Sequence, residues 1–387
     1  SLLTGQLTTA GTWQSTQADI TADDWQNAGT FLSLGSLTGS ISHSLTSSGA
    51  IRSQEALSIS AETLKNQGQL LSASDVTLNG QALDNQGILQ GQTLALHQTS
   101  VNNAGTLTGV NGLTMGSSTL PLMRARVTAV SPPKELINTG SLLTDGALTL
   151  GADSITNSGS LQGHDVTVDA RQLNNSGTLK SADSLQVVLS DSLTSQAGSK
   201  IIALGSAFLQ APVLQNQGEW SAKSLIIQGD TLTNAGTVSG VNSLNLVLSG
   251  DALQQAGGAL LTGGELLVHA ADIRNDGNMQ GNTLRLTAGN LTNNGLLQGD
   301  SDASLKLTGQ VINNASGQII SGRTLTAITP SLMNYGLIQS ASDSNLKSQT
   351  QIRNAGRLPS GATLPAIAPQ YTGPGLVQAA TLLFQGA

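Results

Sequence analysis

One short phrase decides the fold: Leu64-Lys65-Asn66-Gln67-Gly68-Gln69-Leu70. Similar phrases recur along the chain. Most have an aliphatic residue four positions before a glycine, an Asn two before it, and another aliphatic residue two after it. The glycines are Gly11, Gly29, Gly49, Gly68, Gly87, Gly105, Gly140, Gly159, Gly177, Gly198, Gly218, Gly236, Gly257, Gly277, Gly295, Gly317, Gly336 and Gly356. Because their usual spacing is about 19 residues, the chain consists of short repeats, which is typical of a solenoid.

Each repeat carries three apolar clusters, and apolar and polar residues alternate within each cluster. Val76 and Leu78 are one example of the third cluster, seven to ten residues after the glycine. A period of two indicates a strand. Three short strands form no stable sheet alone, but stacked repeats give every strand a parallel neighbour on both sides. The pattern therefore predicts an all-β parallel β-helix, a solenoid of about 18–20 coils with three short strands per coil. Leucine-rich repeats have a similar period but need a helical turn in each unit.

The Asn-x-Gly phrase is expected to form one corner of each coil. Glycine accepts a positive φ, and Asn bonds readily to nearby backbone. Stacked Asn side chains can also bond one another along the axis. The expected corner ladder is Asn66, Asn85, Asn103, Asn138, Asn157, Asn175, Asn216, Asn234, Asn275, Asn293, Asn334 and Asn354. Gln196 and Gln255 replace Asn in two corners, while Trp13, Trp25 and Trp220 fall in columns that should point into the core.

The composition narrows the possible functions. The chain has 387 residues and a net charge of −7, which disfavours nucleic acid as a partner. It has no Cys, which excludes disulfides and thiolate metal sites. No run of residues approaches the roughly 18 apolar residues of a membrane span, so the chain is expected not to cross a membrane.

The repeats resemble those of a known group of exported proteins. The phrases Leu64–Leu70, Leu173-Asn174-Asn175-Ser176-Gly177-Thr178-Leu179 and Leu291-Thr292-Asn293-Asn294-Gly295-Leu296-Leu297 look like filamentous-haemagglutinin repeats of two-partner secretion. The resemblance covers about residues 9–356 and is closest to CdiA-type effectors of contact-dependent growth inhibition. It implies a right-handed β-helix, export through an outer-membrane transporter, and a secreted, extracellular location on the surface of a Gram-negative cell. It also implies that the sequence is an interior piece of a longer protein.

Departures from the repeat divide the chain into four parts. Residues 1–120 and 137–356 are expected to form β-helix coils, residues 121–136 an inserted loop rich in basic residues and Pro, and residues 357–387 a Pro-rich degenerate coil or cap. Gly375 lies 19 residues after Gly356 and would define that last coil, with Tyr371 and Val377 in its apolar columns. Around Gly198, Lys200 occupies an apolar column, so we expect a slip of one residue that turns Ile201 inward.

Few residues are candidates for catalysis or metal binding. His97 and His269 occupy equivalent outward positions but lie nine coils apart, so they share neither a metal nor a substrate. Asp300-Ser301-Asp302 offers two carboxylates, but Ca²⁺ needs six to eight oxygen ligands and a solvated loop is the simpler interpretation. We therefore expect no catalytic residue, no metal and no cofactor.

Two main functions remain open. In the first, the segment recognises an outer-membrane protein or surface glycan of a target cell ahead of toxin delivery, through Met123, Arg124, Arg126, Lys134 and Tyr371. The arginines would pair with carboxylates of the partner. In the second, the segment is a passive spacer and the insertion has no role. Adhesion to host cells or glycans is a third possibility.

Overall fold

The computed structural model describes residues 2–116 and 134–386. In these ranges the chain forms 41 strands and no helix. The residues divide into two compact units: Ser1–Asp191 with Lys200–Leu204 form the first, and Ser192–Ser199 with Gly205–Ala387 form the second. In each unit neighbouring strands are parallel and pair with residues one repeat away, for example Leu64 with Leu83 and Leu266 with Leu284. The predicted β-solenoid is confirmed, with about 19 turns in all.

The strands of the first unit follow the chain in order. They are β1 (Leu2–Thr9), β2 (Thr12–Ser15), β3 (Ala18–Asn27), β4 (Thr30–Ser33), β5 (Leu37–Ser47), β6 (Ala50–Ser53), β7 (Leu57–Asn66), β8 (Gln69–Ser72), β9 (Val76–Asn85), β10 (Ile88–Asn103), β11 (Thr106–Met115), β12 (Glu135–Asn138), β13 (Ser141–Leu143), β14 (Ala147–Asn157), β15 (Ser160–Gly163), β16 (Asp165–Asn175), β17 (Thr178–Ser181) and β19 (Lys200–Ala203). Strand β18 (Leu185–Ser195) begins in the first unit and ends in the second.

The second unit contains the remaining strands. They are β20 (Ser206–Gln210), β21 (Val213–Asn216), β22 (Glu219–Gly229), β23 (Thr231–Asn234), β24 (Thr237–Leu248), β25 (Ala252–Gln254), β26 (Ala259–Thr262), β27 (Glu265–His269), β28 (Asp272–Asn275), β29 (Asn278–Ala288), β30 (Asn290–Asn293), β31 (Leu296–Leu307), β32 (Gln310–Asn313), β33 (Gln318–Ser321), β34 (Leu325–Asn334), β35 (Leu337–Ser340), β36 (Ser344–Asn354), β37 (Arg357–Pro359), β38 (Thr363–Ile367), β39 (Gln370–Thr372), β40 (Leu376–Gln378) and β41 (Thr381–Gln385).

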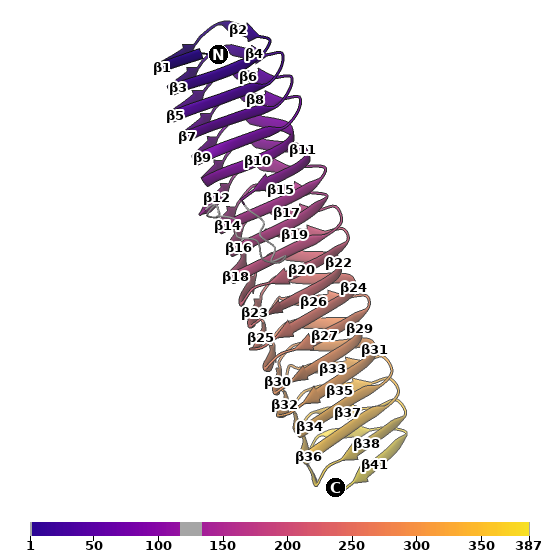
Figure 1. Cartoon of the computed structure of the whole chain (residues 1–387). Helices are drawn as coiled ribbons and strands as arrows, with labels where there is room; N and C mark the ends of the chain where they lie inside the picture. The colour runs from indigo at the N-terminus through magenta and orange to yellow at the C-terminus, as the bar shows by residue number, and fades with distance from the viewer. Residues whose placement is uncertain (1, 117–133, 387) are drawn as a thin grey trace, which may run out of the picture. The chain divides into compact units, whose positions relative to one another are not determined.

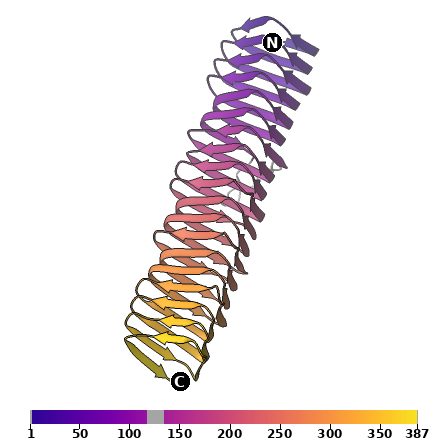
Figure 2. The ribbon, with the colours of Figure 1, turned by 180° about the vertical axis from the view of Figure 1, so that it is seen from behind.

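Each turn has three sides, and the second and third often merge into one bent strand. In one turn β8 is the first side, and β9 supplies the other two. The alternation of buried and exposed residues in β9 breaks near Gly80, where the strand bends. We call this bend the insert corner, the link between β8 and β9 the Asp corner, and the link from Asn85 to β10 the Asn corner. Figures 1 and 2 show the corresponding strands of each unit lying above one another from two opposite sides.

The three predicted apolar columns form the core. Leu64, Leu70, Val76 and Leu78 are almost completely buried, and the equivalent aliphatic residues of the other turns are buried as well. Burial of one such side chain contributes roughly 1.5–3 kcal/mol. Ile201 points inward and Lys200 is exposed, which confirms the slip of one residue.

The tryptophans only partly follow the prediction. Trp25 and Trp220 are fully buried, but Trp13 is 40% exposed, so its predicted inward position is wrong. Trp13 lies on β2, which pairs with β4, and its ring stacks on Phe31 with the ring centres 6.3 Å apart. Phe31 covers part of the indole, and the indole Nε1 donates to Ala10 O at 3.3 Å.

The Asn corner is held by a chain of amide hydrogen bonds. In the first unit Asn66 Nδ2 donates to Asn85 Oδ1 at 2.8 Å, and the bonds continue in the same direction to Asn175. In the second unit one run joins Asn216 to Gln254, and another joins Asn275 to Asn354. The bonding asparagines are buried. These bonds are strong because both partners are shielded from water.

The corner glycines serve a different purpose from the one expected. Only Gly11, Gly198 and Gly257 of the repeat glycines have a positive φ. At the other corners glycine is needed for close approach. At Gly68, for example, a Cβ atom would overlap the carbonyl oxygen of Gly49 in the previous turn. The predicted positive φ is therefore wrong for most corners, since stacking rather than backbone conformation excludes a side chain there.

Three corners are longer by two residues, and this shifts the expected register. Gln196 and Gln255 are exposed, and the buried corner positions belong to Ser195 and Gln254 instead. A tight turn, closed by a bond from Ser199 N to Gln196 O at 3.1 Å, takes up the extra residues after Ser195. The same shift explains two further differences. Ala252, not the expected Leu253, is buried in its apolar column, and Asn313 belongs to the ladder although it lies four positions before Gly317.

Candidate binding surface

The inserted segment interrupts the first unit at its insert corner. Met123, Arg124 and Arg126 lie outside the described residues. The chain leaves the ladder after β11 and re-enters it at Lys134, whose backbone N donates to Thr99 O at 2.7 Å. Glu135 and Leu136, the last residues of the expected 121–136 segment, already belong to β12, and Leu136 is fully buried. The Lys134 side chain is exposed.

A row of alternating charges starts at this corner. Glu135 pairs with Ser154 and Ser154 with Gln172, so Lys134, Asp153 and Arg171 occupy equivalent positions in three successive turns. Arg171 Nε lies 3.2 Å from Asp153 Oδ1, and Arg171 Nη1 lies 2.9 Å from Asp191 Oδ2. All three side chains of these ion pairs are about half exposed, so the pairs add little stability. The row is better understood as a charged surface that adjoins the point of insertion.

Charge is distributed unevenly between the units. Among the described residues the first unit has 14 acidic and 6 basic side chains, whereas the second has 9 acidic and 8 basic. Arg124 and Arg126 belong to the acidic first unit by sequence.

Tyr371 occupies a packing position in the second unit. It lies on β39 and pairs with Ile352, a buried residue of the apolar column. Its ring meets the Phe384 ring edge to face, with the centres 4.8 Å apart. Burial raises the pKa of the Tyr371 hydroxyl above its usual value. Lys134 and Tyr371 lie in different units, so no single unit brings the expected contact residues together.

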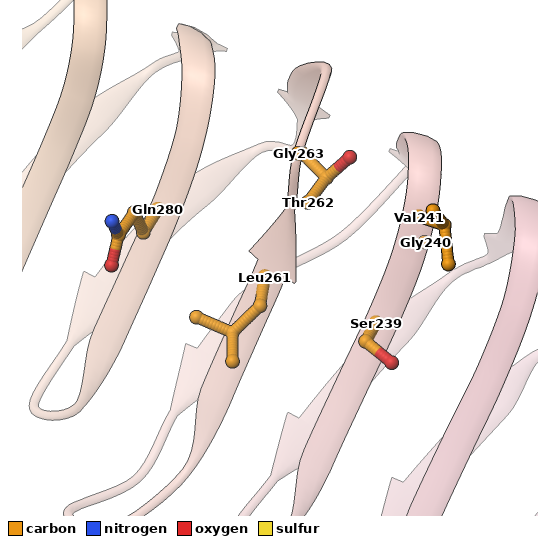
Figure 3. Close-up of a pocket in the computed structure, with 7 residues that line it drawn as sticks. All are labelled: Ser239, Gly240, Val241, Leu261, Thr262, Gly263 and Gln280. Atoms are coloured by element: carbon orange, nitrogen blue, oxygen red, sulfur yellow. The ribbon is translucent and has the colours of Figure 1, made fainter.

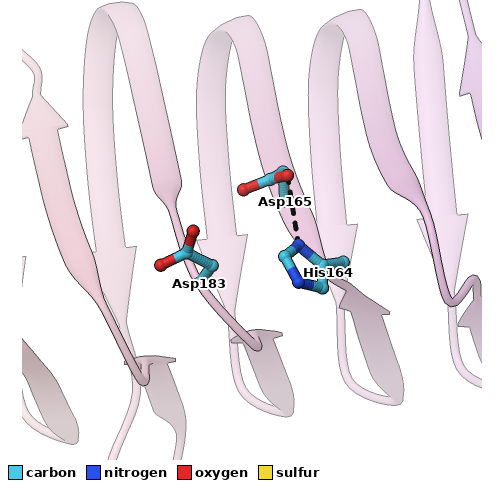
Figure 4. A group of neighbouring side chains, drawn as sticks. All are labelled: His164, Asp165 and Asp183. Atoms are coloured by element: carbon cyan, nitrogen blue, oxygen red, sulfur yellow. Dashed lines mark hydrogen bonds and ion pairs between the residues drawn. The ribbon is translucent and has the colours of Figure 1, made fainter.

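The Asp corner of the first unit gathers three potential metal ligands, shown in Figure 4. Ligand atoms of His164, Asp165 and Asp183 all lie within 4.8 Å of one another. Asp165 Oδ2 lies 3.2 Å from His164 Nδ1, and its Oδ1 accepts hydrogen bonds from the backbone N and hydroxyl of Ser184 in the next turn. The bond from the Ser184 hydroxyl is the main cause that lowers the pKa of the Asp165 carboxyl.

The same bonding pattern recurs in other turns. Thr93 Oγ1 donates to Asp75 Oδ1 at 2.6 Å, and Thr363 Oγ1 donates to Asp343 Oδ1 at 2.7 Å. An Asp at this corner therefore connects its turn to the next one. The Asp165 cluster is one case of this structural device, and sequence inspection missed it because its members come from two successive turns.

The other candidate metal ligands either bond to neighbouring side chains or lie far apart in the chain. Arg323 Nη2 lies 2.9 Å from Asp302 Oδ2, and Gln298 Nε2 donates to Asp300 Oδ1 at 2.7 Å. The Asp300–Asp302 segment is thus cross-linked by neighbouring side chains. His97 and His269 are both exposed and lie in different units.

Two hollows lie on the second unit. The first has a volume of about 320 Å³ and is lined mainly by apolar atoms, with Val241 and Leu261 on neighbouring turns, as Figure 3 shows. Val241 is 69% exposed. The second hollow has a volume of about 530 Å³ and lies at the insert corner of four turns, between Gln210 and His269. Its lining is more polar and includes Gln228, Asp230 and Ser249.

Within the described ranges, no helix is long and apolar enough to cross a membrane.

Comparison with known proteins gives relatives of one kind. The chain is similar to the tRNA nuclease CdiA of Escherichia coli (strain NC101), with 42% identity over 277 residues, which is 71% of this chain and 8% of the relative. It is also similar to the 16S rRNA endonuclease CdiA of Enterobacter cloacae subsp. cloacae, with 38% identity over 347 residues, which is 79% of this chain and 10% of the relative. A deoxyribonuclease CdiA of Dickeya dadantii (strain 3937) is 28% identical over 406 residues, which is 83% of this chain and 12% of the relative.

No family model and no solved structure matches the chain. The chain spans about a tenth of the length of these CdiA relatives, and the matches cover most of its own length. The predicted resemblance to CdiA-type exoproteins is confirmed. The chain is therefore homologous to one segment of CdiA proteins, and its β-solenoid is consistent with a filamentous-haemagglutinin-type repeat region.

Proposed function

We propose that this segment is a receptor-binding part of an exported CdiA-type exoprotein. It is exported through an outer-membrane transporter and displayed on the surface of a Gram-negative cell. There it recognises an outer-membrane protein of a target bacterium, ahead of toxin delivery. The observation that carries the proposal is the long insertion between Gly105 and Gly140, which interrupts the solenoid without disturbing the pairing of β12 with β10 and β14.

The inserted residues have the chemistry of a contact segment. Met123 supplies an adaptable apolar side chain, and Arg124 and Arg126 supply planar donors that bind carboxylates in pairs. Lys134 adds an exposed positive charge at the base of the insertion. An acidic outer loop of a membrane protein would match this set. Tyr371 is the weakest member because its ring packs against Phe384.

We further infer that the segment has no nuclease activity of its own. The relatives are named as nucleases, but this chain corresponds to only 8–12% of their length. In the Asp corner the Asp165 carboxylate is engaged by His164 of its own turn and by Ser184 of the next turn. A passive spacer is the second candidate function, and the continuous parallel pairing of successive turns in the second unit favours it.

The test replaces residues 121–133 by a short Gly-Ser link and retains Lys134 and the buried Leu136. Circular dichroism should show the same β-signature as the parent chain, since β12 keeps its partners. Binding to target cells should fall by about tenfold or more, because charged hydrogen bonds are worth roughly 1.5–3 kcal/mol each.

A second variant removes the charge of the inserted segment but keeps its length. Arg124→Ala with Arg126→Ala should weaken binding as the link does. Lys223→Ala with Lys347→Ala removes the same charge from exposed positions of the second unit and should leave binding unchanged. Equal binding by the parent chain and the arginine variant would leave the spacer as the better function.

A further inference from the structure

The polar hollow at the insert corner of the second unit is a recess that spans four turns. Gln210 pairs with Gln228, Gln228 with Val247, and Val247 with His269, so these four side chains form one outward row. At about 4.8 Å per turn the row is about 14 Å long. The hollow has a volume of about 530 Å³.

Unequal corner lengths create the recess. A single residue, Asp230, links β22 to β23, whereas residues 249–251 link β24 to β25. The longer link stands beside a floor made of small or buried residues, among them Ala211, Gly229 and Leu248. A Cβ atom at Gly229 would overlap the carbonyl oxygen of Ala211, so the floor is fixed by packing.

The exposed groups of the recess suit a ligand with many hydroxyls. Gln210 and Gln228 each offer a carbonyl oxygen and an amide donor, and His269 offers ring nitrogens. Asp230 Oδ1 accepts a hydrogen bond from Ser249 Oγ at 2.6 Å, which fixes the carboxylate and leaves its second oxygen free to accept. Val247 provides a small apolar contact in the middle of the row.

Other ligand classes fit less well. Among the described residues that line the recess none is Lys or Arg, so nothing there compensates the charge of a phosphate or an acidic sugar. An extended peptide usually binds by adding a strand to a free sheet edge. Here the corner backbone is already paired, since Ser249 N donates to Gly229 O at 3.0 Å and Ala271 N donates to Gly250 O at 2.7 Å.

We infer that this recess binds an uncharged oligosaccharide of a cell-surface glycan. The amides and the Asp230 carboxylate hydrogen-bond sugar hydroxyls along the row, and the C–H face of a sugar ring lies against Val247. The site goes beyond the proposed function, because it is a second site in the unit that does not carry the insertion.

The experiment uses the full chain with a panel of uncharged hexose and N-acetylhexosamine oligosaccharides. Sialylated and sulfated oligosaccharides serve as charged counterparts. Saturation-transfer NMR identifies the binders, and calorimetry measures their affinity. Gln228→Ala should weaken the best uncharged binder about fivefold, and Gln228→Ala with His269→Ala about thirtyfold, since each hydrogen bond is worth about 1 kcal/mol. Gln339→Ala, an exposed Gln on the first side of another turn of the same unit, should bind like the parent chain.

Three results would overturn the inference. They are no saturable binding of any uncharged oligosaccharide at millimolar concentration, tighter binding of the charged counterparts, and unchanged affinity of the double variant. The chain in which a Gly-Ser link replaces residues 121–133 should keep its full affinity for the oligosaccharide. Loss of cell binding by that chain together with intact sugar binding would show that the two sites act separately.

Discussion

Replacing Asn157 by Ala tests how much one member of the amide ladder stabilises the first unit. Asn157 accepts a hydrogen bond from Asn138 and donates to Asn175 Oδ1, both at 2.8 Å, and it also donates to the carbonyl oxygens of Gly159 and Thr178. All of these bonds disappear in the variant. Its neighbours in the ladder each lose one partner while they remain buried.

The expected loss is about 3 kcal/mol, because each buried bond contributes roughly 0.5–1.5 kcal/mol and an unpaired buried group adds its own penalty. Repeat proteins can open in parts, so a single unfolding midpoint would mix events from different turns. Hydrogen exchange followed by mass spectrometry reports the opening of β14, β16 and β17 directly. Exchange of their amides should become about a hundredfold faster, since 1.4 kcal/mol corresponds to a factor of ten.

Asn174→Ala is the matched control, since Asn174 is the neighbouring residue of Asn175 and points outward. Its cost should stay within about 0.5 kcal/mol. Asn66→Ala should cost about half as much as Asn157→Ala, because Asn66 Oδ1 has no partner among the described residues. If the amides of β14, β16 and β17 exchanged at the same rate in Asn157→Ala and in Asn174→Ala, the ladder would contribute no stability and the reasoning would fail.

Three further predictions use other parts of the solenoid. Gly159→Ala should destabilise its turn and the neighbouring turns by about 2 kcal/mol or more, measured by the same hydrogen exchange, because its Cβ would overlap the previous turn, whereas Gly112→Ala should be tolerated, since its nearest contact would be 3.7 Å away. Trp220→Phe should cost about 2 kcal/mol in the same assay, because it removes the bond from Nε1 to Ser195 Oγ at 2.8 Å and leaves a small cavity. A hydrogen bond from an arginine holds the pKa of Asp302 below its usual 3.8, so its contribution is present above that pH and is lost as the pH falls through the lower folded value. Thermal unfolding followed from neutral to acidic pH should therefore show a smaller acid loss in Asp302→Asn than in the parent chain.

The repeat pattern predicts the solenoid because one physical requirement, an apolar residue at every inward position, acts in nearly every turn. Leu64, Leu70 and Val76 are buried where the period places them. Trp13 could not be placed by the same rule, since its burial depends on a covering neighbour as well as on its column. Burial depends on what stacks above and below a residue, which a pattern within one repeat does not contain.

Register was harder to predict than fold. Glycines served as landmarks, but the corners after Ser195, Gln254 and Asn313 contain two additional residues, so positions counted back from Gly198, Gly257 or Gly317 are displaced. Aligning the repeats on the buried ladder position of the Asn corner would have revealed the additional residues, because that position is occupied by Ser, Gln or Asn.

The candidate binding features were the least predictable. The polar hollow depends on unequal links at Asp230 and at residues 249–251, and the row from Gln210 to His269 appears only when four turns are aligned. No local motif marks either feature. The insertion, by contrast, is evident as a gap between Gly105 and Gly140.

The insert corner has a consequence for how such a chain can change. The first unit pairs β10 with β12 and β11 with β14 across the interruption, with the same residue-to-residue matching as in uninterrupted turns. The Asn corner varies much less, since its longer links, after Ser195, Gln254 and Asn313, contain only two additional residues. Foreign loops of very different length can therefore be grafted at the insert corner while the strand pairing on both sides of it is kept. Binding specificity can then be exchanged without redesign of the solenoid.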